Sequence, residues 1–379
     1  MEHRIVPLVK AIRLLARALP APRRCRCPLA RAAGRYAACD CRAAAAVPAR
    51  RTAGRDGFLV GAGAPPGVYR VAGEYSPAAP PPHAPGEGTT YRVEKGSPIP
   101  DGADVVPAVS AALVGTGAVR LPSPSGETAV PAGSLLAAGT IVVARGERIS
   151  PGAAALLRAS GLDEVEVIDP PVVHVVVIGT EIARGVVPDL ATPWLRDTLG
   201  GLGIPVTQVA ALPDDAERIR GCIVDALAGG CVVACGGTGD GLTDVTIDAF
   251  RPGGIRFVAE SVAMIPGSTA AIALARAGAG LFMPGDPESM VALTHALLRP
   301  ALARRFEMKI GSWEDAPPLP LLHPWSGPGD VHAFVPAAVR EGAIEVVDRA
   351  GAGGLLAGAR HALMPPGGRE RRRAVPVPP

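Results

Sequence analysis

Glycine-rich stretches recur next to short apolar runs in the middle third of the chain. Residues 179–181 follow the apolar run 172–178, and residues 236–241 (GGTGDG) follow Cys231–Cys235. Residues 284–287 (PGDP) lie between a third apolar run and a helical pattern. Glycine lets backbone N–H groups turn inward and approach phosphate oxygens closely. These stretches predict a site for an anionic, phosphate-bearing ligand.

Acidic residues accompany these glycines. Glu181 and Asp244 have no basic sequence neighbours. Two carboxylates that face one phosphate repel it unless they hold a divalent cation, so the pattern predicts Mg²⁺. Asp214-Asp215 has a plainer alternative, because one of the two is expected to cap the helix that starts at Ala216.

The elements that must position these residues alternate in type. Strands are expected over 172–178, 204–210, 231–235, 255–259 and 280–283, and helices over 192–201, 215–228 and 288–305. Such alternation predicts an α/β unit with a parallel sheet. Ligands of open parallel sheets bind beyond the carboxyl ends of the strands. The three glycine-rich loops are therefore expected at one edge of the sheet.

The α/β domain is expected to span 172–310, and the rest of the chain is expected to form three smaller domains. These are an N-terminal helical and linker domain (1–46 and 145–171), a β-rich domain (47–144) and a C-terminal β domain (311–379). Residues 1–41 are read as one or two helices, with Ile5, Leu8, Ile12 and Leu15 on one face. Residues 76–88, rich in proline, cannot form a helix or a central strand. Residues 369–373 are expected to be a solvated tail.

Composition narrows the function classes. The chain has 379 residues, is 48% hydrophobic, and contains no apolar run near the ~20 residues of a membrane span. Residues 172–300 contain eight Arg, no Lys and thirteen acids, which argues against nucleic acid as a partner. Seven cysteines, an odd number, favour a reducing compartment, and we expect a cytoplasmic protein. The basic residues 4–35 could pass for a transit peptide, but an ordinary helix is the preferred interpretation.

The cysteines are expected to be reduced thiols, with Cys222, Cys231 and Cys235 in the core. Cys25, Cys27, Cys39 and Cys41 have C-x-C spacing, whereas structural zinc sites use C-x₂-C, so a metal is disfavoured. Residues 236–241 match neither the dinucleotide fingerprint nor a P-loop. There is also no serine nucleophile motif or H-E-x-x-H sequence.

Taken in order, these stretches resemble the molybdopterin molybdenumtransferase family, the MoeA and gephyrin E-domain type. The resemblance rests on residues 33–35 with 39–40, Arg55–Phe58 (family M-D-G-Y), Gly96–Val106 (G-A-P-L-P-x-G-A-D-A-V-V), Ile178–Ile182 (T-G-D-E-L), 236–244 (G-G-V-S-V-G-x-x-D), 283–287 (L-P-G-N-P), and 351–356 with 366–367. No single motif is decisive, but their order and spacing are.

The resemblance implies a homodimer of elongated, four-part subunits with a MogA-like molybdopterin-binding domain. It implies that molybdate is inserted into adenylylated molybdopterin and AMP is released, with molybdopterin adenylyltransferase as a possible partner. The implied catalytic residues are Glu181, Asp215 and Asp244, and the implied Mg²⁺ ligands are Glu181, Asp214, Asp215 and Asp244. The implied ligand-binding residues are Gly179, Thr180, Gly236, Gly237, Thr238, Gly239, Gly241, Pro284, Gly285 and Asp286. Asp56 and Asp104 are expected to reach the cleft of the neighbouring subunit.

Departures from the family pattern keep a second function open. Thr180 replaces an aspartate, Leu190-Ala191 replaces Ser-Asn, Gly239 replaces a serine, and residues 265–269 (IPGST) lack the two lysines of K-P-G-K-P. Lost cations weaken charge-assisted contacts to an anion. The alternative is a molybdopterin-binding or delivery protein without catalysis. A third, weaker alternative is an adenylyltransferase, because residues 238–240 resemble the loop of that enzyme. Catalysis requires that Glu181 and Asp244 converge on one cation.

Overall fold

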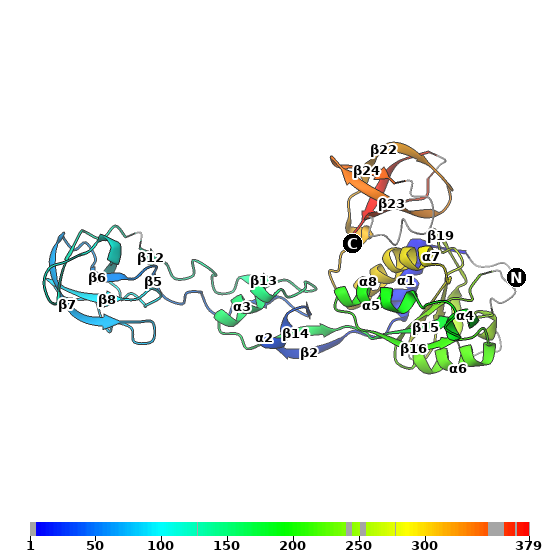
Figure 1. Ribbon diagram of the computed structural model, residues 1–379, viewed down its shortest axis with the longest axis horizontal. Helices are drawn as coiled ribbons and strands as arrows, with labels where there is room; N and C mark the ends of the chain where they lie inside the picture. Colours follow the sequence, from blue (N-terminus) through cyan, green and yellow to red (C-terminus); the bar gives the residue numbers. More distant parts are fainter. Residues whose placement is uncertain are drawn as a thin grey trace.

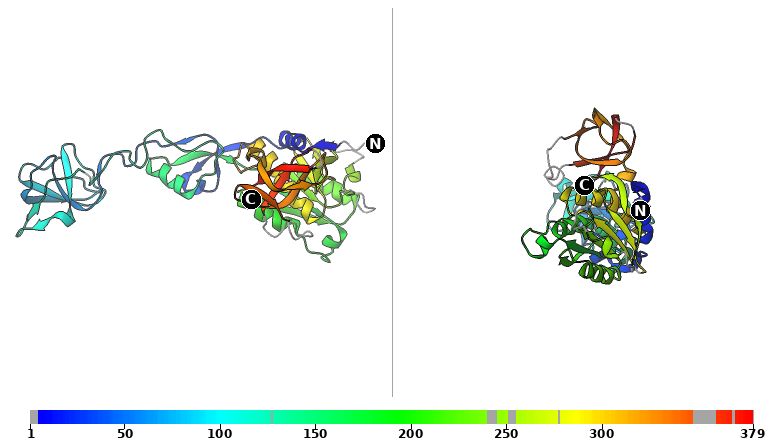
Figure 2. Two further views of the ribbon diagram at one scale, coloured as in Figure 1. Left: turned by 90° about the horizontal axis from the view of Figure 1, so that it is seen from above. Right: turned by 90° about the vertical axis from the view of Figure 1, so that its right-hand side faces the viewer.

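The protein is an elongated molecule in which a narrow stalk separates a distal β region from an α/β region (Figure 1). This computed structural model describes residues 5–126, 128–239, 245–250, 255–276, 278–347, 360–367 and 370–378, with the side chains of 370 and 371 excluded. The C-terminal β region packs against the α/β region, and both lie at the end of the molecule opposite the distal region (Figure 2).

The α/β region is built on a mixed sheet with the strand order β16-β15-β17-β21-β20-β18. Its strands are β15 (Val173–Ile178), β16 (Val206–Leu212), β17 (Cys231–Cys235), β18 (Arg256–Ala259), β20 (Ala271–Leu274) and β21 (Ala279–Met283). β15, β16, β17 and β21 are parallel, as predicted, and helices form the crossovers from β15 to β16 and from β16 to β17. β20 runs antiparallel to both of its neighbours, β21 and β18, and it was not predicted.

Helices cover both faces of this sheet. They are α1 (Leu8–Ala18), α4 (Thr180–Ala183), α5 (Ala191–Gly201), α6 (Ala216–Leu227), α7 (Pro287–Leu293), the π-helix η3 (Thr294–Leu298), α8 (Arg299–Phe306), and the 3₁₀ turns η2 (Asp248–Phe250) and η4 (Trp313–Asp315). In β15, Val173, Val175 and Val177 pack with α1, α5, α7 and α8, while Val176 and Ile178 pack with α6. This burial on both faces explains the continuous apolar run.

The first residues of the chain join the α/β region. β1 (Ile5–Pro7) pairs with β19 (Ser261–Ile265), and α1 buries Leu8, Ile12 and Leu15 in the largest core cluster. Ile5 was predicted on the same apolar face, but it lies in β1 and its side chain is 65% exposed. β19 in turn pairs with the C-terminal β region, so it links two parts of the molecule.

The stalk contains less helix than predicted. It consists of β2 (Arg23–Pro28), α2 (Leu29–Ala32), β3 (Tyr36–Ala37), β4 (Cys41–Arg42), β13 (Ile141–Val143), α3 (Pro151–Ala159) and β14 (Glu164–Asp169). The prediction of one or two helices over 1–41 is confirmed by α1 and is wrong for β2, which pairs with β14 along its whole length. The cysteines of β2 face inward and its arginines outward, a period of two that suits a strand.

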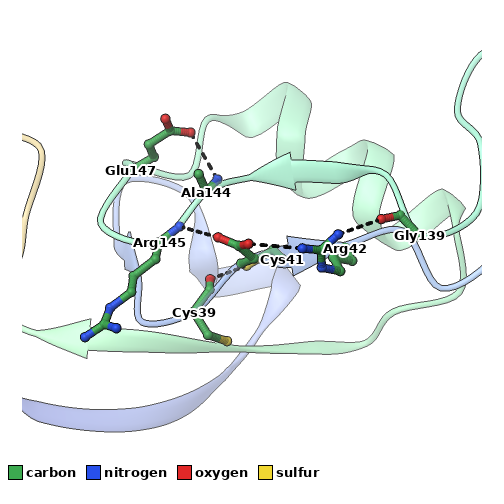
Figure 3. A network of polar contacts seen from close by, with 8 residues as sticks. Cys39, Cys41, Arg42, Gly139, Ala144, Arg145 and Glu147 are labelled. Atoms are coloured by element: carbon green, nitrogen blue, oxygen red, sulfur yellow. Dashed lines mark hydrogen bonds and ion pairs between the residues drawn. The ribbon is translucent and has the colours of Figure 1, made fainter.

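A network of polar contacts lies within the stalk (Figure 3), and ion pairs link the stalk to the segment after α8. The backbone N–H of Arg145 donates to Asp40 Oδ1 at 3.0 Å, and the Arg145 side chain pairs with Glu307 after α8. Lys309 pairs with Glu147 at 3.2 Å. The backbone N–H of Ala144 and then Lys309 lower the pKa of Glu147. The ion pairs that cross between the regions are solvent-exposed, so each contributes little to stability.

The distal β region carries a sheet with the order β10-β11-β7-β8-β6-β9. The strands of this sheet are β6 (Gly57–Gly61), β7 (Gly67–Tyr75), β8 (Thr89–Val93), β9 (Ala103–Pro107), β10 (Ala112–Leu113) and β11 (Ala118–Leu121). The region also contains the 3₁₀ turn η1 (Ala108–Ser110) and the strands β5 (Thr52–Ala53) and β12 (Ala129–Val130), which pair with each other. Residues 76–88, all of them described, form the connection between β7 and β8 without a helix or a named strand, as predicted.

The C-terminal β region is a small barrel. β22 (Leu319–Ser326), β23 (His332–Arg340), β24 (Ala343–Val346), β25 (Arg360–Met364) and β26 (Glu370–Val377) pair around a closed ring, because β23 contacts both β24 and β25. The prediction of a solvated tail at 369–373 is wrong for its described part. β26 pairs with β22 and β25, and Ala374 is buried. The strand was not predicted because β26 begins with charged residues and its apolar residues follow them.

The barrel meets the α/β region at a buried histidine. His295 of η3 lies between Trp194 and the rings of Phe334 and His361, and its Nδ1 is 2.9 Å from Arg299 Nη1. Burial, the Arg299 cation and His361 lower the pKa of His295 to about 3. His295 is therefore neutral at neutral pH.

This histidine predicts acid sensitivity. Because the folded-state pKa lies below the unfolded value near 6.5, the unfolded chain binds the proton first, and stability is lost as the pH falls from about 6.5 towards 3. We expect the His295→Phe variant to lose less stability over this window than the wild type, by on the order of a few kcal/mol. Denaturant unfolding at pH 7 and pH 5 measures the difference. The exposed His323→Phe variant serves as control, and equal pH slopes in all three proteins would refute the prediction.

Candidate functional site

The glycine-rich loops lie at one edge of the α/β sheet. β16, β15, β17 and β21 are neighbours and run in parallel, so their carboxyl ends meet there. The backbone N–H of Gly236 donates to the Met283 carbonyl oxygen at 2.9 Å, and that of Gly179 to the Leu212 carbonyl oxygen at 2.9 Å. The predicted convergence of the loops is confirmed, and the loop after β16 joins them.

Two glycines permit this close approach. Gly236 has φ +111°, and a Cβ added there would overlap the Ile178 carbonyl oxygen. Gly237 has φ +65°, and its Cβ would overlap Thr246 Oγ1. A Cβ on Gly285 would lie 3.4 Å from the Gly236 Cα. Backbone in these conformations accepts side chains only with strain, so glycine is required at 236 and 237.

Threonines flank the β17 loop. Thr238 is 5% exposed, and its Oγ1 has no hydrogen-bond partner within the described part of the chain. Thr246 donates from Oγ1 to the Gly236 carbonyl oxygen at 3.2 Å and from its backbone N–H to Gly237 at 3.1 Å. Sequence reasoning missed Thr246, although a hydroxyl a few residues after a glycine-rich loop was a usable signal. Gly239 is exposed, while Gly241 and Asp244 lie outside the described residues.

The two adjacent acids after β16, Asp214 and Asp215, make different contacts. Asp215 is the N-cap of α6, since its Oδ1 accepts from the backbone N–H groups of Glu217 and Arg218 at 3.1 and 3.0 Å. The helix-capping alternative therefore holds for Asp215. Asp214 Oδ2 accepts from the backbone N–H and the hydroxyl of Thr180 at 2.9 and 2.8 Å.

The loop after β21 enters a helix, as predicted. Asp286 is the N-cap of α7 and its Oδ1 accepts from the Ser289 backbone N–H at 2.7 Å, while Pro284 and Gly285 precede it. A Cβ on Gly267, in the segment that lacks the family lysines, would lie 2.8 Å from Leu293 Cγ of this helix. The segment 265–269 therefore packs against the C-terminal end of α7.

The described residues offer Mg²⁺ few donors. Among them, no group of three or more His, Cys, Asp or Glu side chains gathers to hold a metal. Asp215 is engaged as a cap and Asp214 Oδ2 by Thr180. The exposed Glu181 is the remaining described carboxylate of the predicted set. The predicted convergence with Asp244 falls outside the described residues.

Asp56 and Asp104 lie far from this edge within the chain. Asp56 is next to β6 and Asp104 is in β9, at the far end of the stalk (Figure 1). Asp56 Oδ1 accepts the Lys95 backbone N–H at 2.7 Å, and Asp104 pairs with Arg51. If they serve the site, they serve that of another chain.

The stalk cysteines are core residues. Cys27 and Cys41 are buried in the stalk core, Cys25 packs against it, and Cys39 is exposed. Burial, followed by Cys39 and Asp40, raises the pKa of Cys41 to about 11, so it is a thiol. Of the three cysteines predicted in the core, Cys231 and Cys235 are buried, whereas Cys222 is half-buried at the edge of the cluster around α6.

Comparison with known families agrees with this arrangement. The family model described as "MoeA N-terminal region (domain I and II)" matches residues 6–161, and the one described as "Probable molybdopterin binding domain" matches residues 174–304. The chain belongs to the MoeA family. The second match contains the β15, β17 and β21 loops.

Individual MoeA relatives are similar over most of the chain. The molybdopterin molybdenumtransferase of Synechococcus elongatus is 29% identical over 336 residues, which cover 82% of this chain and 81% of the relative. Molybdopterin molybdenumtransferase 2 of Mycobacterium tuberculosis is 29% identical over 232 residues, 56% of each chain. The MoeA crystal structure from Pyrococcus horikoshii has a TM-score of 0.77 at 24% identity and 99% coverage of both chains, which supports the fold.

Proposed function

We propose that this protein is a molybdopterin molybdenumtransferase, which inserts molybdate into adenylylated molybdopterin and releases AMP. The observation that carries the proposal is the meeting, at one sheet edge, of the Gly236–Gly237 backbone, the Glu181 loop and the Thr238 hydroxyl, which has no partner among the described residues. Backbone N–H groups and a buried hydroxyl are donors suited to phosphate oxygens. The matched family models and the names of the relatives support the same reaction.

The residues at the edge would bind and orient the ligand. Gly236 and Gly237 allow the ligand's phosphates to approach the backbone, and the Thr238 hydroxyl donates a hydrogen bond to an anionic oxygen of the ligand. Glu181 would hold Mg²⁺ together with phosphate oxygens, since Mg²⁺ is usually bound by one or two carboxylates plus substrate phosphates. Mg²⁺ would supply charge neutralisation at the pyrophosphate.

The distal region supports a homodimer. The stalk holds Asp56 and Asp104 away from the chain's own sheet edge, so in a twofold dimer they would complete the site of the other subunit. Molybdopterin adenylyltransferase is proposed as the partner that supplies the adenylylated substrate.

All seven cysteines are free thiols in the structure, which supports a cytoplasmic location. Within the described chain, no helix has the length and apolar character to cross a membrane.

A carrier function is the second candidate. Leu190 is 51% exposed beside the site, and residues 265–269 contribute no lysine. These positions carry fewer polar groups than the family pattern, and such a site is better suited to binding the ligand than to cleaving its pyrophosphate bond. Incubation with adenylylated molybdopterin, molybdate and Mg²⁺ decides between them, because the transferase releases AMP and the carrier retains the intact ligand. If ATP and molybdopterin gave an adenylylated product, the protein would be an adenylyltransferase.

A further inference from the structure

Two loops of the sheet edge are tied together by a reciprocal set of hydrogen bonds. The Thr180 hydroxyl donates to Asp214 Oδ2 at 2.8 Å, and the Thr180 backbone N–H donates to the same oxygen at 2.9 Å. In return, the Asp214 backbone N–H donates to Thr180 Oγ1 at 3.1 Å. The hydroxyl is thus donor and acceptor in one closed ring, and bonds to a carboxylate are the stronger kind.

This tie provides a cap that α4 lacks. Gly179 stands at the N-cap of α4 and has no side chain to accept from the first N–H groups. Asp214, which follows β16, accepts the Thr180 N–H instead. Glu181 is the next residue of α4, so its backbone position is set by this contact from another loop.

Threonine at 180 suits this arrangement. A carboxylate there would face Asp214 and repel it, whereas a hydroxyl donates to it. The tie occupies Asp214 Oδ2, and Asp215 next to it caps α6, so both acids already serve hydrogen bonds within the chain.

We propose that Thr180 and Asp214 are positioning residues, which hold the start of α4 so that Glu181 faces the ligand at the sheet edge. The proposal rests on the proposed transferase function. Both residues act through Glu181, and neither contacts Mg²⁺.

Kinetics of AMP release test the positioning role. Thr180→Val keeps the side-chain shape and removes two of the three hydrogen bonds, so kcat is expected to fall roughly tenfold with KM little changed. Thr180→Ser retains the hydroxyl and is expected to recover most of the lost kcat. Thr207→Val, an exposed threonine of β16, is the matched control. An unchanged kcat in Thr180→Val, or no recovery with serine, would overturn the proposal.

The Asp214→Asn variant shows whether Asp214 only ties the two loops together or also binds the metal. The asparagine carbonyl oxygen can still accept from Thr180, so the Mg²⁺ concentration for half-maximal rate is expected to change less than about threefold. A loss of metal affinity on the order of tenfold or more would instead make Asp214 a ligand and contradict the proposal.

Amide hydrogen exchange tests the tie without any ligand. The Thr180 N–H is expected to exchange about tenfold faster in Asp214→Ala than in the wild type, because its acceptor is gone. Equal exchange rates would overturn the tie. A wild-type protein that releases no AMP but shows this exchange difference would overturn only the transferase function.

Discussion

Gly236→Ala is expected to abolish AMP release and to lower the free energy of unfolding by about 3 kcal/mol or more. The new methyl group would overlap the Ile178 carbonyl oxygen at the end of β15, and alanine would be strained at φ +111°. The overlap can be relieved only if the β15 and β17 loops move apart. That movement opens the surface on which phosphates are expected to bind, so activity falls by more than stability alone requires.

Gly221→Ala is the matched control. Gly221 lies in α6, where a Cβ would meet no atom within 4 Å, so the variant should keep its activity and gain up to ~1 kcal/mol of stability. Molybdopterin binding and denaturant unfolding measured on both variants separate the site from the fold. A Gly236→Ala protein that is stable and fully active would contradict the proposed role of this loop.

Mixing two inactive variants is expected to restore activity if the site is shared between subunits. Asp56→Asn alters the distal region and keeps an acceptor for the Lys95 N–H, while Asp244→Ala alters the sheet-edge loop. After random exchange of subunits, half of the dimers carry both variants. Each of these contains one intact site, so AMP release should return to roughly a quarter of the wild-type rate.

Each variant mixed with itself is the control and should stay inactive. Analytical ultracentrifugation verifies that the mixed sample is dimeric. A dimeric mixture without recovered AMP release would show that Asp56 and Asp244 do not act in sites shared by two subunits.

The strands of the α/β region could be predicted because burial on both faces leaves an unbroken apolar run. Val173–Ile178 and Cys231–Cys235 are such runs, and both are parallel strands of one sheet. Their glycine-rich ends could be predicted to meet, because parallel strands end at a common edge. Fold class and family were thus readable before the structure.

The stalk and the barrel were harder because their strands have polar outer faces. β2 alternates arginine with cysteine, and this resembled a basic helix. Its partner β14 is more than a hundred residues away, and a pairing at that distance leaves no local signal. β26 likewise begins with a run of charged residues, which does not show the apolar alternation expected of a strand.

For the acid pair of the candidate site, the sequence predicted that one residue caps a helix but did not say which. The adjacent acids Asp214 and Asp215 are equivalent in the sequence, yet one ties Thr180 and the other caps α6. The direction of each side chain depends on where β16 ends relative to β15 and α6. That register comes from tertiary packing, which a single sequence does not display.

The most direct measurement is AMP release from adenylylated molybdopterin with and without molybdate, in the wild type and in Asp244→Ala. A transferase is expected to release AMP only when molybdate and Mg²⁺ are both present, and Asp244→Ala should lose this release while Gly221→Ala keeps it. Tight binding of adenylylated molybdopterin with no AMP release by the wild type would contradict the account and make this protein a carrier.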